Sequence, residues 1–240
     1  MKKRFKILFR KFIFKYFERF TNPYYFSDTL RLEGFDIGGG SIFYSPKTMS
    51  IDRERPWMLK IGKYCKITKG VTILTHDYSR SVLRRKYGEF IGEAGITKIG
   101  DNVFIGMHSI ILMGTHIGSN SIVGAGSVVK GNFPDNVVIA GNPARVICTL
   151  DEYLTKRKAR TLKEAKIYIE SFKDKYGYYP DSKHCGPFFA LYEDRDAFDY
   201  ENDPRLFCNG DNHNEIVEDF KRSKPIFSNY NYFIDAIKDS

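Results

Sequence analysis

The chain has 240 residues, of which 42% are hydrophobic and 15% aromatic, and a formal net charge of +9. Its four cysteines are widely spread and form no CxxC pair, which excludes a disulfide framework and a metal knuckle and fits a reducing compartment. No apolar run approaches the ~18 residues that a membrane span requires.

The positive charge is concentrated at the N-terminus. Residues 1–20 hold eight Lys or Arg and one Glu, a net charge of +7, so the other 220 residues carry only +2. This distribution argues against a general nucleic-acid-binding surface. The segment predicts a basic amphipathic helix, because apolar residues recur along it at helical spacing: Phe5, Leu8, Phe9, Phe12, Tyr16 and Phe20. Two interpretations stay open, peripheral contact with an anionic inner membrane surface and packing against the rest of the protein.

A strict six-residue period defines the centre of the chain. Every sixth position is a β-branched aliphatic residue: Ile99, Ile105, Ile111, Ile117, Val123 and Val129. The next position is mostly glycine, and the fourth position after each aliphatic is small or β-branched. This period fits neither a helix nor an ordinary strand. It is typical of a parallel β-helix, in which each hexapeptide forms one face of a triangular coil and the aliphatic side chain points inward.

A weaker register runs from Ile37 to Ile73 and is interrupted at Arg55. A charged residue in the prism interior carries a large penalty, so the segment 52–57 is predicted to bulge outward or to shift register. Ile73 and Ile99 are 26 residues apart, which is not a multiple of six. We therefore expect residues 74–98 to form a loop that leaves the coil near His76, a common location of function on a rigid scaffold. Its basic residues include Arg80, Arg84, Arg85 and Lys86.

The repeat, the loop that opens with His76, and the closing segment Gly141–Ile147 together resemble the hexapeptide-repeat acyltransferases. The nearest branch is that of galactoside and maltose O-acetyltransferases and bacterial surface-polysaccharide O-acetyltransferases. The resemblance covers about residues 37–150. It implies a left-handed parallel β-helix, acetyl-CoA as the donor, and a homotrimer with active sites between subunits. Handedness comes only from the resemblance, since general crossover rules favour a right-handed connection.

The resemblance also implies site residues. His76 matches the general base that deprotonates a sugar hydroxyl during its attack on the thioester, a task that suits an imidazole near neutral pH. Backbone N–H groups around Gly106 and Met107 match the oxyanion site, although many relatives carry Ser or Ala where Met107 stands. Gly124 and Ala125 match the segment that lines the pantetheine of the donor.

Three further assignments have explicit alternatives. Lys130 lies one position away from a family lysine that contacts the phosphate end of CoA, and Arg145 matches an arginine near the same end. Each of them is alternatively a solvated surface charge. Asp52 or Glu54 could supply the carboxylate of the acceptor pocket, and Asp52 is the preferred candidate. The alternative for Asp52 is a structural ion pair to Arg53 or Arg55.

A second histidine keeps other functions open. His108, close to the expected oxyanion site, is an alternative general base. The γ-type carbonic anhydrases share the β-helix and bind zinc through histidines spaced HxxxxH, but Met113 stands five residues after His108 and is a poor ligand beside imidazoles. We therefore expect no metal. N-acetylation of an amino sugar and a non-catalytic carbohydrate-binding scaffold are the alternatives to O-acetylation.

Residues 151–240 lie outside the repeat and are too rich in Tyr and Phe for a disordered acidic tail. The capping-box pattern of Thr161–Glu164 predicts the start of a helix that ends at Gly177. The sequence thus predicts three parts: a helix and lead-in over 1–36, a mainly β domain with a left-handed β-helix over 37–150, and a helical extension over 151–240. The expected protein is a cytoplasmic homotrimer that acetylates a hydroxyl of a bacterial surface-polysaccharide unit or its precursor, without nucleic acid as a partner.

Overall fold

The computed structural model describes residues 22–206 and 209–239. The amphipathic helix predicted for residues 1–20 therefore lies outside the described residues. The chain divides into two compact units, with the division between Tyr153 and Leu154. Over the described ranges, no helix combines the length and the apolar character that crossing a membrane demands.

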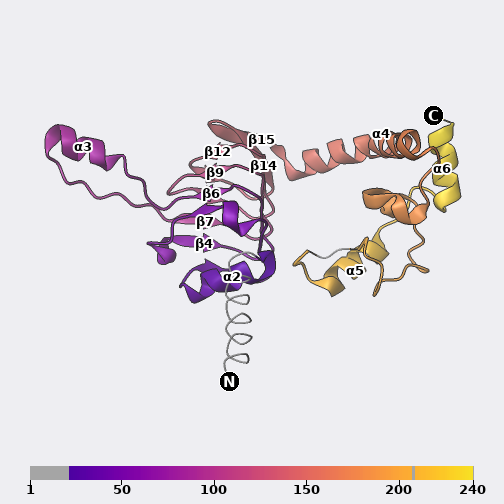
Figure 1. The fold of residues 1–240 in the computed structure, drawn as a ribbon, viewed down its shortest axis with the longest axis horizontal. Coiled ribbons are helices and arrows are strands. Elements are labelled where there is room, and N and C mark those ends of the chain that lie inside the picture. The colour runs from indigo at the N-terminus through magenta and orange to yellow at the C-terminus, as the bar shows by residue number, and fades with distance from the viewer. Residues whose placement is uncertain (1–21, 207–208, 240) are drawn as a thin grey trace, which may run out of the picture. The chain divides into compact units, whose positions relative to one another are not determined.

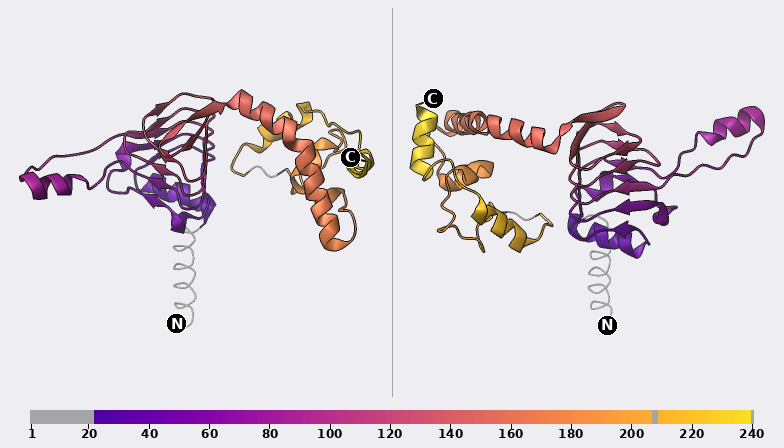
Figure 2. Two further views of the ribbon diagram at one scale, coloured as in Figure 1. Left: turned by 90° about the horizontal axis from the view of Figure 1, so that it is seen from above. Right: turned by 180° about the vertical axis from the view of Figure 1, so that it is seen from behind.

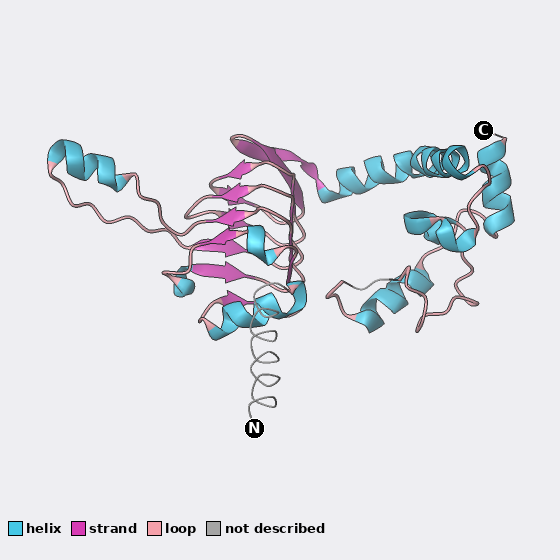
Figure 3. Cartoon of the chain, viewed as in Figure 1, coloured by secondary structure: helices cyan, strands magenta, loops and turns pink. Residues whose placement is uncertain are grey.

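The first unit is a parallel β-helix with three sheets (Figures 1 and 3). The first sheet contains β1 (Asp36–Ile37), β4 (Leu59–Ile61), β7 (Thr97–Ile99), β10 (His116–Ile117) and β13 (Asn132–Phe133). The second contains β2 (Ile42–Phe43), β5 (Lys66–Ile67), β8 (Phe104–Ile105), β11 (Ile122–Val123), β14 (Val137–Gly141) and β15 (Ala144–Thr149). The third contains β3 (Ser50–Ile51), β6 (Thr72–Ile73), β9 (Ile110–Ile111) and β12 (Val128–Val129). Apart from the β14–β15 hairpin, all these pairs are parallel, and each sheet holds strands from successive coils.

The interior confirms the predicted aliphatic stack. The six aliphatic residues of the strict repeat are at most 3% exposed, so the prism is a dry apolar core. Buried hydroxyl groups close the corners by bonding to backbone carbonyls: Ser109 and Ser127 both donate to the Gly124 carbonyl, at 2.9 and 2.6 Å. A β-carbon added to Gly106 would lie 2.5 Å from the Ala125 nitrogen, which is why this corner requires glycine.

The register of the first coils is interrupted around Arg55, as predicted, but the shift already begins at Pro46–Thr48. A short 3₁₀ turn at Pro46–Thr48 moves the third strand to Ser50–Ile51, so Ile51 rather than Met49 aligns with Ile73. A second 3₁₀ turn, Pro56–Met58, restores the register for β4. Arg55 lies between the strands and donates from Nη1 to the Glu93 carbonyl at 2.9 Å.

Two elements complete this unit. Helix α2 (Pro23–Leu32) covers the first coil, where the rings of Phe26 and Phe43 meet at 5.4 Å. The loop between β6 and β7 projects from the coil and carries helix α3 (Arg80–Tyr87), as Figure 2 shows. The loop agrees with the prediction from the sequence, whereas its helix was not predicted.

The second unit is helical, with α4 (Leu150–Tyr176), α5 (His213–Arg222) and α6 (Tyr230–Lys238). The prediction that its first helix begins at Thr161 is wrong, because α4 is continuous from Leu150. The capping box is formed by Thr149 and Glu152, whose side chains accept each other's backbone N–H at 3.2 and 2.9 Å. The predicted end is confirmed by Gly177, which has φ +80° and donates to the Lys173 carbonyl.

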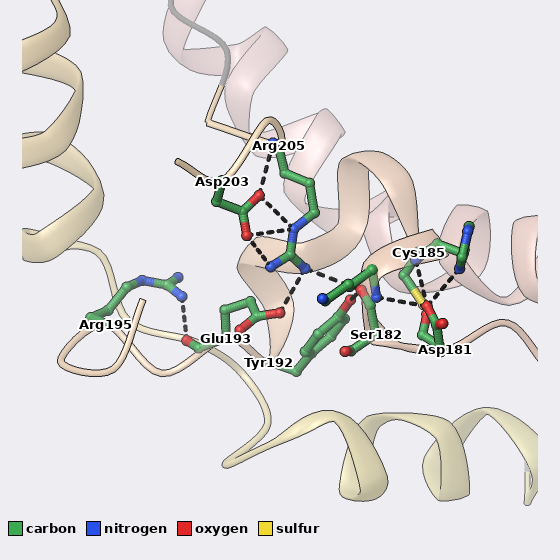
Figure 4. A network of polar contacts seen from close by, with 10 residues as sticks. Asp181, Ser182, Cys185, Tyr192, Glu193, Arg195, Asp203 and Arg205 are labelled. Carbon is green, nitrogen blue, oxygen red and sulfur yellow. Dashed lines mark hydrogen bonds and ion pairs between the residues drawn. The ribbon is translucent and has the colours of Figure 1, made fainter. Parts of the chain in front are cut away.

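A polar network holds the irregular segment that follows α4 (Figure 4). Arg205 donates to the Asp203 carboxylate and to Glu193 Oε1, and its guanidinium lies 5.2 Å from the centre of the Phe189 ring. The hydrogen bonds to Asp203 raise the pKa of Arg205 above its ordinary value, against the opposing effect of burial. This half-buried cation therefore ties three parts of the segment together.

Candidate active site

The third sheet brings Asp52 and His76 together. Because β3 and β6 pair with Ile51 opposite Ile73, the residues that follow the two strands emerge at the same corner. The Asp52 N–H donates to the Ile73 carbonyl at 3.1 Å and fixes this register. Asp52 Oδ2 then lies 2.5 Å from His76 Nδ1, and both residues are 9% exposed.

The Asp52 carboxylate has three hydrogen-bonding partners. The Thr75 hydroxyl donates to Oδ2, the oxygen that also faces His76, and the Glu54 N–H donates to Oδ1 at 3.1 Å. Burial opposes the charge of Asp52, but the hydrogen bonds from Thr75, His76 and Glu54 outweigh it and hold the pKa of Asp52 below its usual value. An ionised Asp52 accepts the proton on Nδ1, which leaves Nε2 of the neutral ring with a free lone pair.

The base of the projecting loop is tied to the coil beside this pair. The Gly95 N–H donates to the Thr75 carbonyl at 3.0 Å, and the Thr97 hydroxyl donates to the Leu74 carbonyl at 2.7 Å. Tyr78 packs edge-on against the His76 ring with centroids 5.1 Å apart. Backbone contacts before and after the loop thus hold the imidazole in place.

The residues expected to bind the oxyanion lie at another corner of the coil. Gly106 and Met107 follow β8 in the second sheet, whereas His76 follows β6 in the third. The Gly106 N–H is engaged with the Val123 carbonyl at 2.8 Å. Among the described residues the Met107 N–H has no hydrogen-bond partner, so it is the donor that remains available. His108 shares this corner and therefore does not accompany His76.

The four residues assigned to the donor divide between two corners. Gly124 and Ala125 follow β11 and stack on Gly106, at the same corner as Met107. Arg145 pairs with Ala140 in the β14–β15 hairpin. Ala140 in turn lies next to Gly124, because a β-carbon added to Gly124 would be 3.0 Å from the β-carbon of Ala140. Arg145 therefore lies at this corner too. Lys130 follows β12 in the third sheet and lies on the His76 corner instead. Both Lys130 and Arg145 are exposed. No three His, Cys, Asp or Glu side chains gather as a metal site in the described part of the chain.

Both members of the buried pair are among the residues predicted from the sequence, but their contact is not. Asp52 was assigned to the acceptor, with Arg53 or Arg55 as an alternative partner. In the structure Arg53 forms an ion pair with Glu33 at 3.3 Å, and the Asp52 carboxylate turns to His76. The signal available was that Asp52 directly follows β3 and His76 lies three residues after the end of β6, which the insertions in the early coils obscured.

Comparison with known proteins agrees with this architecture. Residues 96–130 match the family model described as hexapeptide repeat of succinyl-transferase. Protein CapG of Staphylococcus aureus is 39% identical over 155 residues, which cover 61% of this chain and 89% of CapG.

Two further relatives share a smaller part of their length. The galactoside O-acetyltransferase of Escherichia coli (strain K12) is 38% identical over 130 residues, or 54% of this chain and 60% of that enzyme. The putative lipopolysaccharide biosynthesis O-acetyl transferase WbbJ of the same strain is 47% identical over 132 residues, or 49% of this chain and 64% of WbbJ. The chain thus spans less than two thirds of these two relatives. The repeat and the near-complete coverage of CapG show that this chain belongs to the hexapeptide-repeat acyltransferase family.

Proposed function

We propose that this protein transfers the acetyl group of acetyl-CoA to a hydroxyl group of a sugar, with His76 as the general base. The observation that carries this proposal is the buried Asp52–His76 pair beside the projecting loop. An unprotonated Nε2, held in one orientation by an ionised carboxylate, is the arrangement that hydroxyl activation needs. The names of the galactoside and lipopolysaccharide relatives support a carbohydrate acceptor.

The proposed reaction uses His76, Met107 and Asp52 in separate roles. Nε2 of His76 takes the proton of the acceptor hydroxyl as its oxygen bonds to the thioester carbonyl carbon. The Met107 N–H stabilises the negative charge on the carbonyl oxygen of the tetrahedral intermediate. The carbon–sulfur bond then breaks, the thiolate of CoA leaves, and the proton on His76 returns to sulfur. Asp52 is a positioning residue, since it acts through the imidazole and stabilises its charged form.

The proposal includes a homotrimer with a left-handed coil. One chain places His76 and Met107 at different corners, so a complete site needs the His76 corner of one subunit next to the Met107 corner of another. Gly124, Ala125 and Arg145 then line the donor from the Met107 side. Lys130 contributes from the His76 side.

The test is acetyl transfer by the full chain. Release of CoA thiol from acetyl-CoA is measured with a panel of neutral and charged sugars, and without acceptor as the control. The proposal predicts acceptor-dependent release and an alkali-labile ester product. An alkali-stable product would mean amide formation on an amino sugar. No acceptor-dependent release with any sugar would mean a carbohydrate-binding scaffold instead of an enzyme.

A further inference from the structure

The projecting loop forms an open cavity of about 510 Å³ between helix α3 and the segment that returns to the coil. Helix α3 forms one side and residues 89–92 form the other; Figure 2 shows this arm of the molecule. The main lining side chains are Tyr78, Arg80, Ser81, Arg84, Glu89 and Phe90. Cavities of several hundred cubic ångströms accommodate small ligands, and this volume is enough for a hexose with an attached charged group.

The cavity carries an excess of positive charge. Arg80 and Arg84 are one helical turn apart and therefore lie on the same face of α3, whereas Glu89 is the single carboxylate in the lining. Their guanidinium groups lie over aromatic rings, Arg80 at 5.9 Å from Tyr78 and Arg84 at 5.8 Å from Phe90. Neither arginine forms an ion pair with a described residue. Two guanidinium groups that face one carboxylate and form no ion pair among the described residues are suited to an anion.

The cavity is connected to the candidate base through Tyr78. This ring lines the cavity and also packs edge-on against the His76 imidazole at 5.1 Å. The return segment is fixed by Arg55, which donates to the Glu93 carbonyl at 2.9 Å, and by the Ser79 hydroxyl, which lies 3.4 Å from Glu93 Oε2. Tyr78 is therefore the side chain that contacts both the cavity and the imidazole, while His76 itself is not part of the lining.

We propose that this cavity binds a phosphate group of the acceptor, so that the preferred acceptor is a phosphorylated sugar. The inference rests on the proposed function and adds the chemical class of its substrate. Arg80 and Arg84 hold the phosphate oxygens, Tyr78 packs against the sugar ring, and a hydroxyl of that ring faces His76. The negative charge is matched by guanidinium forks, which bind phosphate through paired N–H groups.

Binding is measured first, by isothermal titration of the full chain with glucose 1-phosphate, glucuronate and methyl glucoside. Glucose 1-phosphate is expected to bind at least ~10-fold more tightly than either other sugar, in line with a contribution of about one order of magnitude from a charged hydrogen bond. Arg80→Ala and Arg84→Ala are expected to abolish this preference. Arg85→Ala is the matched control, because it removes the same charge from α3 at a residue outside the cavity lining. Equal affinity for the three sugars would overturn the proposal, and so would an effect of Arg85→Ala equal to that of Arg80→Ala and Arg84→Ala. Tighter binding of glucuronate than of glucose 1-phosphate would also overturn it, because the cavity would then prefer a carboxylate to a phosphate.

Turnover separates this inference from the proposed function. With wild-type protein, kcat/KM for phosphorylated acceptors should exceed that for methyl glucoside, and Arg84→Ala should reduce the ratio at least ~10-fold, mainly through KM. UDP-glucose and a polyprenyl phosphate-linked glucose in detergent micelles distinguish a nucleotide source of the phosphate from a lipid source. If no sugar is acetylated but glucose 1-phosphate binds as described, the proposed reaction fails while the phosphate site stands. Turnover of neutral sugars with no arginine dependence would leave the reaction and remove the phosphate site.

Discussion

Replacing Asp52 by Asn tests the catalytic pair most sharply, because the substitution keeps the shape of the side chain and removes its charge. In the proposed mechanism the imidazole becomes positively charged while Asp52 faces it, with Nδ1 and Oδ2 2.5 Å apart. For charge centres ~4 Å apart and an effective dielectric constant of ~20, the attraction is about 4 kcal/mol. If the whole of this attraction stabilises the transition state, it accounts for a rate increase of about 10³-fold.

We therefore expect Asp52→Asn to lower kcat by ~10²- to 10³-fold, since a neutral hydrogen bond to Nδ1 remains possible. The KM for acetyl-CoA should stay within about twofold, because the Asp52 side chain bonds to Glu54, Thr75 and His76 and to none of the four residues assigned to the donor. The assay is acceptor-dependent thiol release. Thr75→Val is the matched control: it removes the hydroxyl that bonds to the same carboxylate oxygen but keeps the charge, so its effect should be no more than ~10-fold. A kcat for Asp52→Asn within about threefold of wild type would refute the role of the carboxylate.

Remaining predictions concern pH, the core, the corners and the second unit. The pKa of Asp52 is lowered in the folded state, so its ionised carboxylate stabilises the fold at pH values above the ordinary pKa of ~4, and this stabilisation is lost as pH falls through the lowered pKa of the folded state. The loss of unfolding free energy caused by Asp52→Asn should therefore become smaller below pH ~4. A loss that becomes larger there would contradict the pairing of Asp52 with His76. Ile111→Ala should cost about 2–5 kcal/mol in urea denaturation, whereas Ile110→Ala, on the outer face, should cost under ~1 kcal/mol; equal losses would contradict the inward stack. Gly106→Ala should weaken acetyl-CoA binding or lower the melting temperature, unlike an alanine at Gly39, where an added β-carbon meets nothing within 4 Å. Arg205→Ala should destabilise the second unit by about 3–5 kcal/mol in hydrogen exchange of α5 and α6, and unchanged protection there would count against the network.

The regular coils could be predicted from sequence because their physical requirement is local and repeats. Each interior position from Ile99 to Val129 must be apolar and each tight corner must be small, so six-residue periodicity reports both conditions directly. The interruption at Arg55 could be predicted from the same requirement, because a charged side chain cannot replace an aliphatic one in the buried stack. It did not give the size of each insertion, which depends on turns such as Pro46–Thr48.

The site was only partly predictable, because it also depends on insertions whose size the six-residue period does not report. His76 stands out as a histidine at the start of a loop in an otherwise periodic chain. Its contact with Asp52 depends on the alignment of Ile51 with Ile73, and the expected register placed Met49 there instead. Helix α4 begins at Leu150, beside the capping pair Thr149 and Glu152, and not at Thr161, because a capping pattern alone cannot tell a helix start from a helix interior. The partners of Arg205 are set by tertiary packing that no local pattern reports.

The most direct test of the central claim compares the two candidate bases in the full chain. His76→Ala removes the imidazole that faces Asp52, and His108→Asn removes the other candidate with a residue that tolerates the φ of +59° at that position. The account predicts that His76→Ala lowers acceptor-dependent acetyl transfer by ~10²- to 10⁴-fold while acetyl-CoA binding by isothermal titration stays within about threefold, and that His108→Asn keeps most of the turnover. Turnover by His76→Ala within about tenfold of wild type, or its loss only in His108→Asn, would contradict the account.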